Sequence, residues 1–186
     1  MRYSDTHKSE TRARIVKNAA AAFRKHGVDG IGVAALMKKA GLTHGGFYAH
    51  FESKDALVAE AIDAAFEQSL ASLAATVEIS DPERRRDVLM SRYLSDVHRD
   101  QPASGCVFAA MGSDAARLKP ALRARFDANF ETMIGLLSQG SDEPQVRAAA
   151  IARYTAAIGA LIVSRAVRSK ALSDEVLNAA RLHHPG

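Results

Sequence analysis

Residues 33–54 read VAALMKKAGLTHGGFYAHFESK, and this stretch decides the fold of the N-terminal part of the chain. Apolar residues recur at helical spacing over 33–40, which predicts a short helix. Gly41 can adopt the positive φ that a tight turn after this helix needs. Thr43 is then expected to cap a further helix over about 44–50 with its hydroxyl group. Two short helices joined in this way have the dimensions of a helix-turn-helix.

The second of these helices presents a surface that suits DNA. Two successive glycines each cost roughly 1 kcal/mol in a helix relative to Ala, which is easier to understand if another backbone approaches closely there. A helix N-terminus attracts phosphate, and Tyr and His side chains can donate hydrogen bonds to it. The alternatives are simple packing of Tyr48 and a solvated His44. The residues expected at this surface are Thr43, His44, Gly45, Gly46, Tyr48, His50 and Lys54.

The run AGLTHGGFYAHFESKDAL, residues 40–57, resembles the signature of the TetR family of transcriptional regulators. The family pattern is roughly A-G-V-S/T-x-G-x-F/L-Y-x-H/Y-F-x-S/T-K-E/D-x-L, and the resemblance covers about residues 10–60. It implies phosphate or base-edge contacts to double-stranded operator DNA from Thr43, His44, Gly45, Tyr48, His50 and Lys54. Gly32 departs from the family, which usually has Ser or Thr there as the cap of the first of the two helices.

Charge and composition agree with an intracellular DNA-binding protein. Residues 1–54 contain ten Lys or Arg and four Asp or Glu, whereas the remaining 132 residues contain fifteen and seventeen. A basic first third favours a polyanionic partner, although a solvated helical face would give the same balance. One cysteine, no apolar N-terminal segment and no apolar run longer than 156–163 predict a cytoplasmic protein without a membrane span. We expect no cofactor and no metal site.

The rest of the chain predicts helices only, and therefore an all-α fold of about nine helices. Hydrophobic residues make up 47% of the sequence, which is enough for a packed core. We expect a DNA-binding domain over 1–53 and an effector-binding and dimerisation domain over 54–186. Besides the helix-turn-helix, helices are expected over about 9–26, 54–77, 82–99, 106–117, 120–139, 143–168 and 173–183, with Ser53, Asp81, Asp142 and Ser173 as N-caps.

The resemblance further implies a homodimer and a small-molecule pocket in the larger domain. The run 156–163 is apolar on nearly every side, so it is expected to be buried on both sides, in a dimer interface or in the core of a monomer. The pocket residues are predicted from inward spacing alone, and a packed core would show the same spacing. They are Phe66, Leu70, Met90, Tyr93, Cys106, Phe108, Met111, Phe130, Met133 and Tyr154. Few charges occur among them, which favours an apolar effector.

Cys106 supports a second interpretation. A thiol in the first turn of a helix has its thiolate stabilised by the helix dipole, and His98 or Arg99 could add to this effect. The pair Gly105-Cys106 is also similar to a feature of one TetR subgroup, some of whose members respond to oxidants or electrophiles. The alternative is that Cys106 is a small buried apolar residue, as free cysteines usually are.

These observations predict a ligand-responsive repressor, released from a palindromic operator by a small molecule. The alternative is a thiol-based redox or electrophile sensor acting through Cys106. An enzyme is disfavoured because the sequence contains no H-E-x-x-H, P-loop or nucleophile elbow. A protein-interaction module that has lost DNA binding is disfavoured by the intact surface between Thr43 and Lys54.

Overall fold

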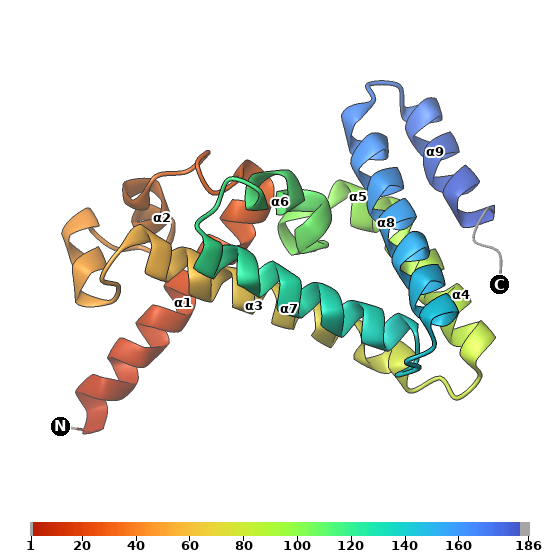
Figure 1. The fold of residues 1–186 in the computed structure, drawn as a ribbon. Helices are drawn as coiled ribbons and strands as arrows, with labels where there is room; N and C mark the ends of the chain where they lie inside the picture. The colour runs from red at the N-terminus through yellow and green to blue at the C-terminus, as the bar shows by residue number, and fades with distance from the viewer. Residues whose placement is uncertain (1, 183–186) are drawn as a thin grey trace.

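A computed structural model describes residues 2–182, and over this range the protein is entirely helical (Figure 1). The predicted all-α class is therefore confirmed. The described elements are α1 Arg2–His26, α2 Val33–Lys39, the 3-10 helix η1 His44–Ala49, α3 Lys54–Val77, α4 Pro82–Tyr93, α5 Asp96–Asp100, the 3-10 helix η2 Pro102–Ser104, α6 Val107–Ala115, α7 Pro120–Leu137, α8 Pro144–Ala166 and α9 Lys170–Leu182.

The N-terminal unit forms where α1, α2 and η1 pack against the first turns of α3 (Figure 1). Its core consists of fully buried apolar side chains from all four elements, and burial of each such side chain contributes about 1.5–3 kcal/mol. Ile15 and Phe23 come from α1, Leu36 from α2, Phe47 from η1 and Leu57 from α3. The segment from Thr43 to Lys54, called the recognition segment below, is thus held on a small core of its own.

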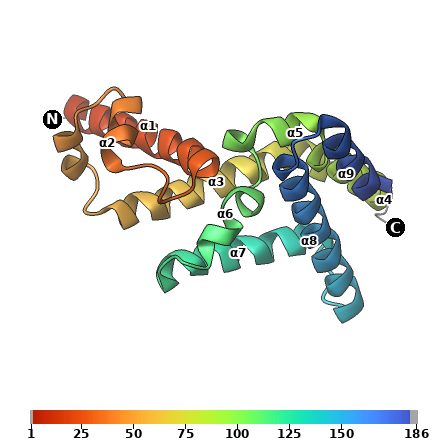
Figure 2. The same cartoon turned by 90° about the horizontal axis from the view of Figure 1, so that it is seen from above.

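The larger part of the molecule is built on α3 and α7, which run side by side in the same direction (Figures 1 and 2). Ion pairs between Lys119 and Asp55 and between Arg125 and Asp63 fix this register. At the far end α8 and α9 pack against each other in opposite directions, and α8 also contacts α6 and α7. The helix α4 follows α3 and lies beside α9 at this far end, α5 contacts α8, and α6 contacts α3, α7 and α8 (Figures 1 and 2).

The expected helix over 82–99 is two helices. Asp81 caps α4 as predicted, because its carboxylate accepts hydrogen bonds from the first-turn N–H groups. Leu94 leaves the helical conformation, with φ −91° and ψ 25°, and the Ser95 hydroxyl caps α5 by accepting from the His98 N–H at 3.1 Å. A competing N-cap inside the run therefore divides it.

Two of the predicted N-caps, Asp142 and Ser173, were wrong. Glu143, and not Asp142, is the N-cap of α8, which begins with Pro144 at its first position. Ser173 lies inside α9, which begins at Lys170, and its hydroxyl donates to the Ser164 carbonyl oxygen at 2.6 Å. The predicted end of this helix at His183 lies outside the described residues.

Candidate functional site

The two short helices of the N-terminal unit are joined at Gly41, whose φ is +74°. This is the left-handed conformation that the sequence predicts for the turn. Gly32 stands at the N-cap of α2 in an extended conformation and supplies no side-chain hydrogen bond. The first N–H groups of α2 are consequently left without a side-chain cap.

The helix after the turn is a 3-10 helix, and Thr43 does not cap it in the predicted way. The Thr43 hydroxyl accepts no hydrogen bond from the first turn; its carbonyl oxygen accepts from the Gly46 N–H at 3.2 Å. Two glycines weaken the α-helical conformation, and the i to i+3 pairing of a 3-10 helix serves this short segment. A Cβ added to Gly45 would meet nothing within 4 Å, so its backbone is open to an approaching partner.

The predicted recognition residues lie on this segment and differ in exposure. Thr43, His44, Gly45 and Tyr48 are exposed, and Tyr48 exposes 70% of its surface while its ring edge packs on Phe47. Gly46, His50 and Lys54 are half-buried, and Lys54 lies 3.8 Å from the Asp29 carboxylate. Phe47 and Phe51 are buried, as the core positions of the pattern require.

Arg12, on α1, is a residue that the sequence analysis missed. Its guanidinium donates to the His50 carbonyl oxygen, pairs with Glu60 of α3 and lies 4.2 Å from the centre of the Phe51 ring. Burial and the nearby charges of Lys8 and Arg12 lower the pKa of His50. The end of the recognition segment is therefore clamped between α1 and α3, and the His50 ring is neutral at neutral pH.

Residues 15–61 match the model of the tetR family of bacterial regulatory proteins. This part of the chain therefore resembles a TetR-family N-terminal domain. The match includes α2, η1 and the start of α3, which are the elements that carry the exposed recognition residues.

The similarity to known proteins extends beyond this TetR-family domain. The HTH-type transcriptional repressor NemR of Escherichia coli strain K12 is 26% identical over 136 residues, which are 70% of this chain and 66%, just under two thirds, of the relative. A TetR transcriptional regulator from Chloroflexus aurantiacus superposes with a TM-score of 0.80 at 25% identity, over 96% of this chain and 94% of that chain. The reduced form of E. coli NemR superposes with a TM-score of 0.79 at 21% identity, over 94% and 95%. The whole described fold is thus TetR-like.

The larger part of the chain contains a partly open cavity of about 570 Å³, a volume typical of small-molecule sites. Six of the ten predicted pocket residues line it: Phe66, Leu70, Tyr93, Cys106, Met133 and Tyr154. The other four do not. Met90 and Met111 are buried in core clusters, and the rings of Phe108 and Phe130 pack edge to face, 5.4 Å apart.

Much of the lining is polar, and the sequence analysis missed this part of it. The polar lining residues come from four helices and the loop around η2, so no local pattern groups them in the sequence. They are Ser69, Ser72, Ser91, Arg92, Ser95, His98, Gln101, Ser104 and Asn129. A search limited to large apolar residues at helical spacing could not find them.

Two phenols and a thiol meet at one part of the cavity wall. The Tyr154 hydroxyl lies 3.5 Å from Cys106 Sγ, and the Tyr93 hydroxyl is buried without a hydrogen-bond partner among the described residues. Burial, followed by the neighbouring Cys106, raises the pKa of both Tyr93 and Tyr154. Both phenols therefore remain protonated at neutral pH and can donate hydrogen bonds.

Gly105 and Cys106 are held by His98. The His98 ring donates from Nδ1 to the Tyr93 carbonyl oxygen at 2.7 Å and accepts at Nε2 from the Cys106 N–H at 2.9 Å. Burial lowers the pKa of His98, which favours the neutral ring that both contacts need. A Cβ at Gly105 would lie 2.8 Å from the His98 ring and 3.2 Å from the Arg165 guanidinium. This close approach explains why glycine precedes the cysteine.

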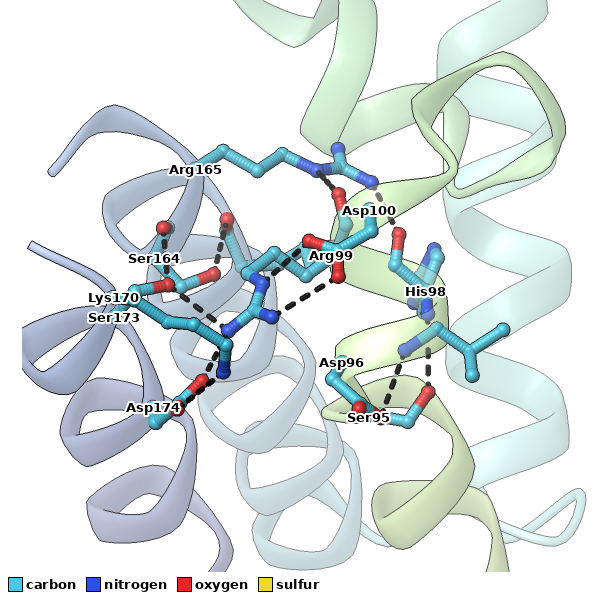
Figure 3. A network of polar contacts seen from close by, with 12 residues as sticks. Ser95, Asp96, His98, Arg99, Asp100, Ser164, Arg165, Lys170, Ser173 and Asp174 are labelled. Carbon is cyan, nitrogen blue, oxygen red and sulfur yellow. Dashed lines mark hydrogen bonds and ion pairs between the residues drawn. The ribbon is translucent and has the colours of Figure 1, made fainter. Parts of the chain in front are cut away.

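A polar network fixes α5, one wall of the cavity, to α8 and α9 (Figure 3). The Arg99 guanidinium, only 7% exposed, pairs with Asp100 and with Asp174 at 2.6 Å, and it donates to the Ser173 hydroxyl at 3.1 Å. Arg165 of α8 donates to the carbonyl oxygens of His98 and Arg99 at 2.7 and 3.0 Å. The wall is therefore attached to the far pair of helices by charged hydrogen bonds.

We predict that Arg99→Ala lowers the free energy of unfolding by about 2–4 kcal/mol, because it removes the buried member of this network. Lys170→Ala is the matched control, since the 76% exposed Lys170 pairs with the same Asp174 and its loss costs much less. Hydrogen bonds from Arg99 lower the pKa of Asp100, and those from Lys170 and Arg99 lower the pKa of Asp174. The stability that they contribute is present above about pH 4 and is lost as the pH falls through the lowered pKa values.

Urea denaturation at fixed protein concentration, repeated between pH 7 and pH 3, measures both effects. The assignment is contradicted if Arg99→Ala and Lys170→Ala lose equal stability at pH 7, or if Arg99→Ala remains as sensitive to acid as the parent protein.

Proposed function

We propose that this chain is a dimeric, ligand-responsive transcriptional repressor without enzymatic activity. The observation that carries the proposal is the joining of a TetR-family N-terminal domain to a helical body with a cavity of about 570 Å³. A relative with 26% identity is named a transcriptional repressor, which supports repression over activation. Occupation of the cavity would weaken operator binding, as a coupling between two sites.

The proposed DNA contacts come from the recognition segment. Thr43, His44, Gly45 and Tyr48 are exposed together there, and such polar and aromatic groups can reach phosphates and base edges in a major groove. The half-buried Gly46, His50 and Lys54 flank them and are proposed to lie against the DNA backbone.

A second copy of the chain is proposed to cover α8 and α9. Ile162 and Val163 of α8 and Leu172 of α9 each expose 44–46% of their surface. Only 22% of the most apolar 18-residue stretch of α8 is buried. Within residues 2–182, α8 is the one helix that is long and apolar enough to cross a membrane. Because α8 packs against α6, α7 and α9, we propose that its exposed face forms a subunit interface and does not contact a membrane. We accordingly propose that the protein is cytoplasmic. A two-fold dimer would read a palindromic operator.

Arg24 connects α1 of the DNA-binding domain to the cavity wall by hydrogen bonds. This buried residue of α1 donates to the Ala65 carbonyl oxygen at 3.3 Å and to Gln68 at 2.7 Å, both on α3. It also donates to the Gly105 carbonyl oxygen at 3.5 Å, directly before Cys106 in the cavity wall. A ligand that displaces this wall would therefore move a contact of α1.

A second candidate function is thiol sensing. Cys106 is 7% exposed but lines the cavity, so a small reagent that enters the cavity can reach its sulfur. Its neighbour Tyr154 is a hydrogen-bonding group at 3.5 Å that would be disturbed by modification. In this alternative the effector reacts with Cys106 and the same wall carries the signal.

We predict that Tyr48→Ala weakens DNA binding about tenfold or more, because it removes a large exposed donor from the recognition surface. The test is fluorescence anisotropy with duplexes tiled from the DNA that flanks the gene. Thr132→Ala is the control, since Thr132 is exposed on α7, outside the DNA-binding domain and outside the proposed dimer interface. Unchanged affinity of Tyr48→Ala would show that the assigned surface is wrong.

We also predict that replacing Ile162 and Val163 together by Glu converts the dimer to a monomer, because four charges would be buried in one symmetric interface. Sedimentation velocity measures the mass in solution. Tyr48→Glu adds a charge at an exposed apolar position in the DNA-binding domain and should leave the dimer intact. A dimer that survives the double substitution would place the interface elsewhere.

For the thiol alternative we predict that iodoacetamide alkylates Cys106 in the native protein and lowers its affinity for DNA. Mass spectrometry follows the reaction, and Cys106→Ser serves as the unreactive control. A thiol that reacts only after unfolding would contradict sensing and would leave the ligand-responsive repressor as the remaining candidate.

A further inference from the structure

The described side chains that line the main cavity include a positive charge and no negative one. Among the described residues that line it there is no Asp or Glu, and Arg92 is the one such side chain with a permanent full charge. His98 also lines the cavity, but both of its ring nitrogens are engaged in the neutral form with Tyr93 and Cys106. A cationic ligand would find no counter-charge in this lining, whereas an anionic group would find one.

Arg92 has hydrogen-bonding capacity to spare. Its guanidinium donates once, from Nη1 to the Thr76 hydroxyl at 2.9 Å, and it has no ion pair among the described residues. A guanidinium has five N–H donors arranged in a planar fork, which matches the two oxygens of a carboxylate. Arg92 is exposed, so it lies where the cavity meets solvent and keeps its hydration until a ligand binds.

The sequence around Arg92 strengthens the attraction for an anion. Three further arginines, 84 to 86, lie on the same helix α4. One of them, Arg85, lines a neighbouring cavity of about 250 Å³ that shares Leu73 and Met133 with the main cavity. The same helix also carries Glu83 and Asp87, but its four arginines leave it with a net positive charge, and such a charge raises the local concentration of an anionic ligand.

The rest of the wall is suited to an apolar body. Phe66, Leu70, Leu73 and Met133 provide continuous apolar contact from α3 and α7. The Tyr93 hydroxyl, which is buried next to Cys106 and meets no hydrogen-bond acceptor at full hydrogen-bonding geometry among the described residues, adds a neutral donor on the α4 side of the wall. A buried hydroxyl without a good acceptor is unfavourable, so a ligand oxygen placed there would be favoured.

We propose that the cavity binds an amphipathic carboxylic acid, with its carboxylate on Arg92 and its apolar part against Phe66, Leu70 and Met133. This inference rests on the proposed function, since it names the class of effector that the regulator would take. It adds a charged end group to the apolar effector expected from the sequence.

Isothermal titration calorimetry on the full-length protein without DNA tests the ligand class with three probes of equal chain length: decanoate, decanol and decylamine. Decanoate is expected to bind at least about fivefold more tightly than decanol, the gain of a charge-assisted contact at a partly exposed site, and decylamine more weakly than both. Arg92→Gln should remove the preference for decanoate over decanol. Arg123→Gln, at an exposed position on α7 that does not line the cavity, should keep it.

The proposal is overturned if decanol binds as tightly as decanoate, if Arg92→Gln keeps the preference, or if decanoate does not bind at millimolar concentration. A protein that binds flanking DNA but not decanoate refutes the ligand class alone. A protein that binds decanoate but no DNA refutes the proposed function and leaves the ligand class standing.

Discussion

The packing of α1 along α3 is the contact on which the rest of the structure depends, and Arg24 anchors it. Ile15 and Phe23 of α1 are fully buried in the core of the DNA-binding domain. One residue later, Arg24 is 3% exposed and donates only to neutral oxygens, two of them on α3 and one at Gly105. Burial lowers the pKa of Arg24, and an unpaired buried guanidinium would be costly, so these hydrogen bonds hold α1 in one position.

This arrangement places the two proposed activities at opposite ends of one rigid connection. The recognition segment is clamped to α1 and α3 through Arg12, at one end of the molecule (Figure 1). The cavity wall is attached to α1 through Arg24 and to α8 and α9 through Arg99 and Arg165 (Figure 3). The wall therefore contacts both the DNA-binding domain and the helices proposed to form the dimer, as the proposed coupling between the two sites requires.

The sequence predicted most features that depend on a few neighbouring residues, such as turns and helix caps. It did not predict contacts between residues that are far apart in the chain. The turn at Gly41 and the caps at Ser53 and Asp81 depend on a few adjacent residues, and the structure contains them. The Thr43 cap failed because a 3-10 helix, and not an α-helix, follows it. The sequence did not predict the break at Leu94, because the N-cap Ser95 stands within a run whose pattern is otherwise helical.

The cavity shows the same limit. Helical spacing indicates that a residue such as Met111 or Phe108 faces inward, but it does not distinguish a packed core from a hollow. Arg92, Arg99 and Arg24 each form a hydrogen bond with a residue 16 to 81 positions away in the chain. No local sequence pattern predicts such distant pairs.

The central claim is that the segment from Thr43 to Lys54 reads DNA as part of a two-fold dimer. Selection of bound duplexes from a random-sequence pool, followed by sequencing, tests it most directly. The account predicts enrichment of an inverted repeat whose half-sites are separated by a whole number of helical turns, and no enrichment with Tyr48→Ala. Enrichment of a single unrepeated site, or the same enrichment with Tyr48→Ala, would contradict it.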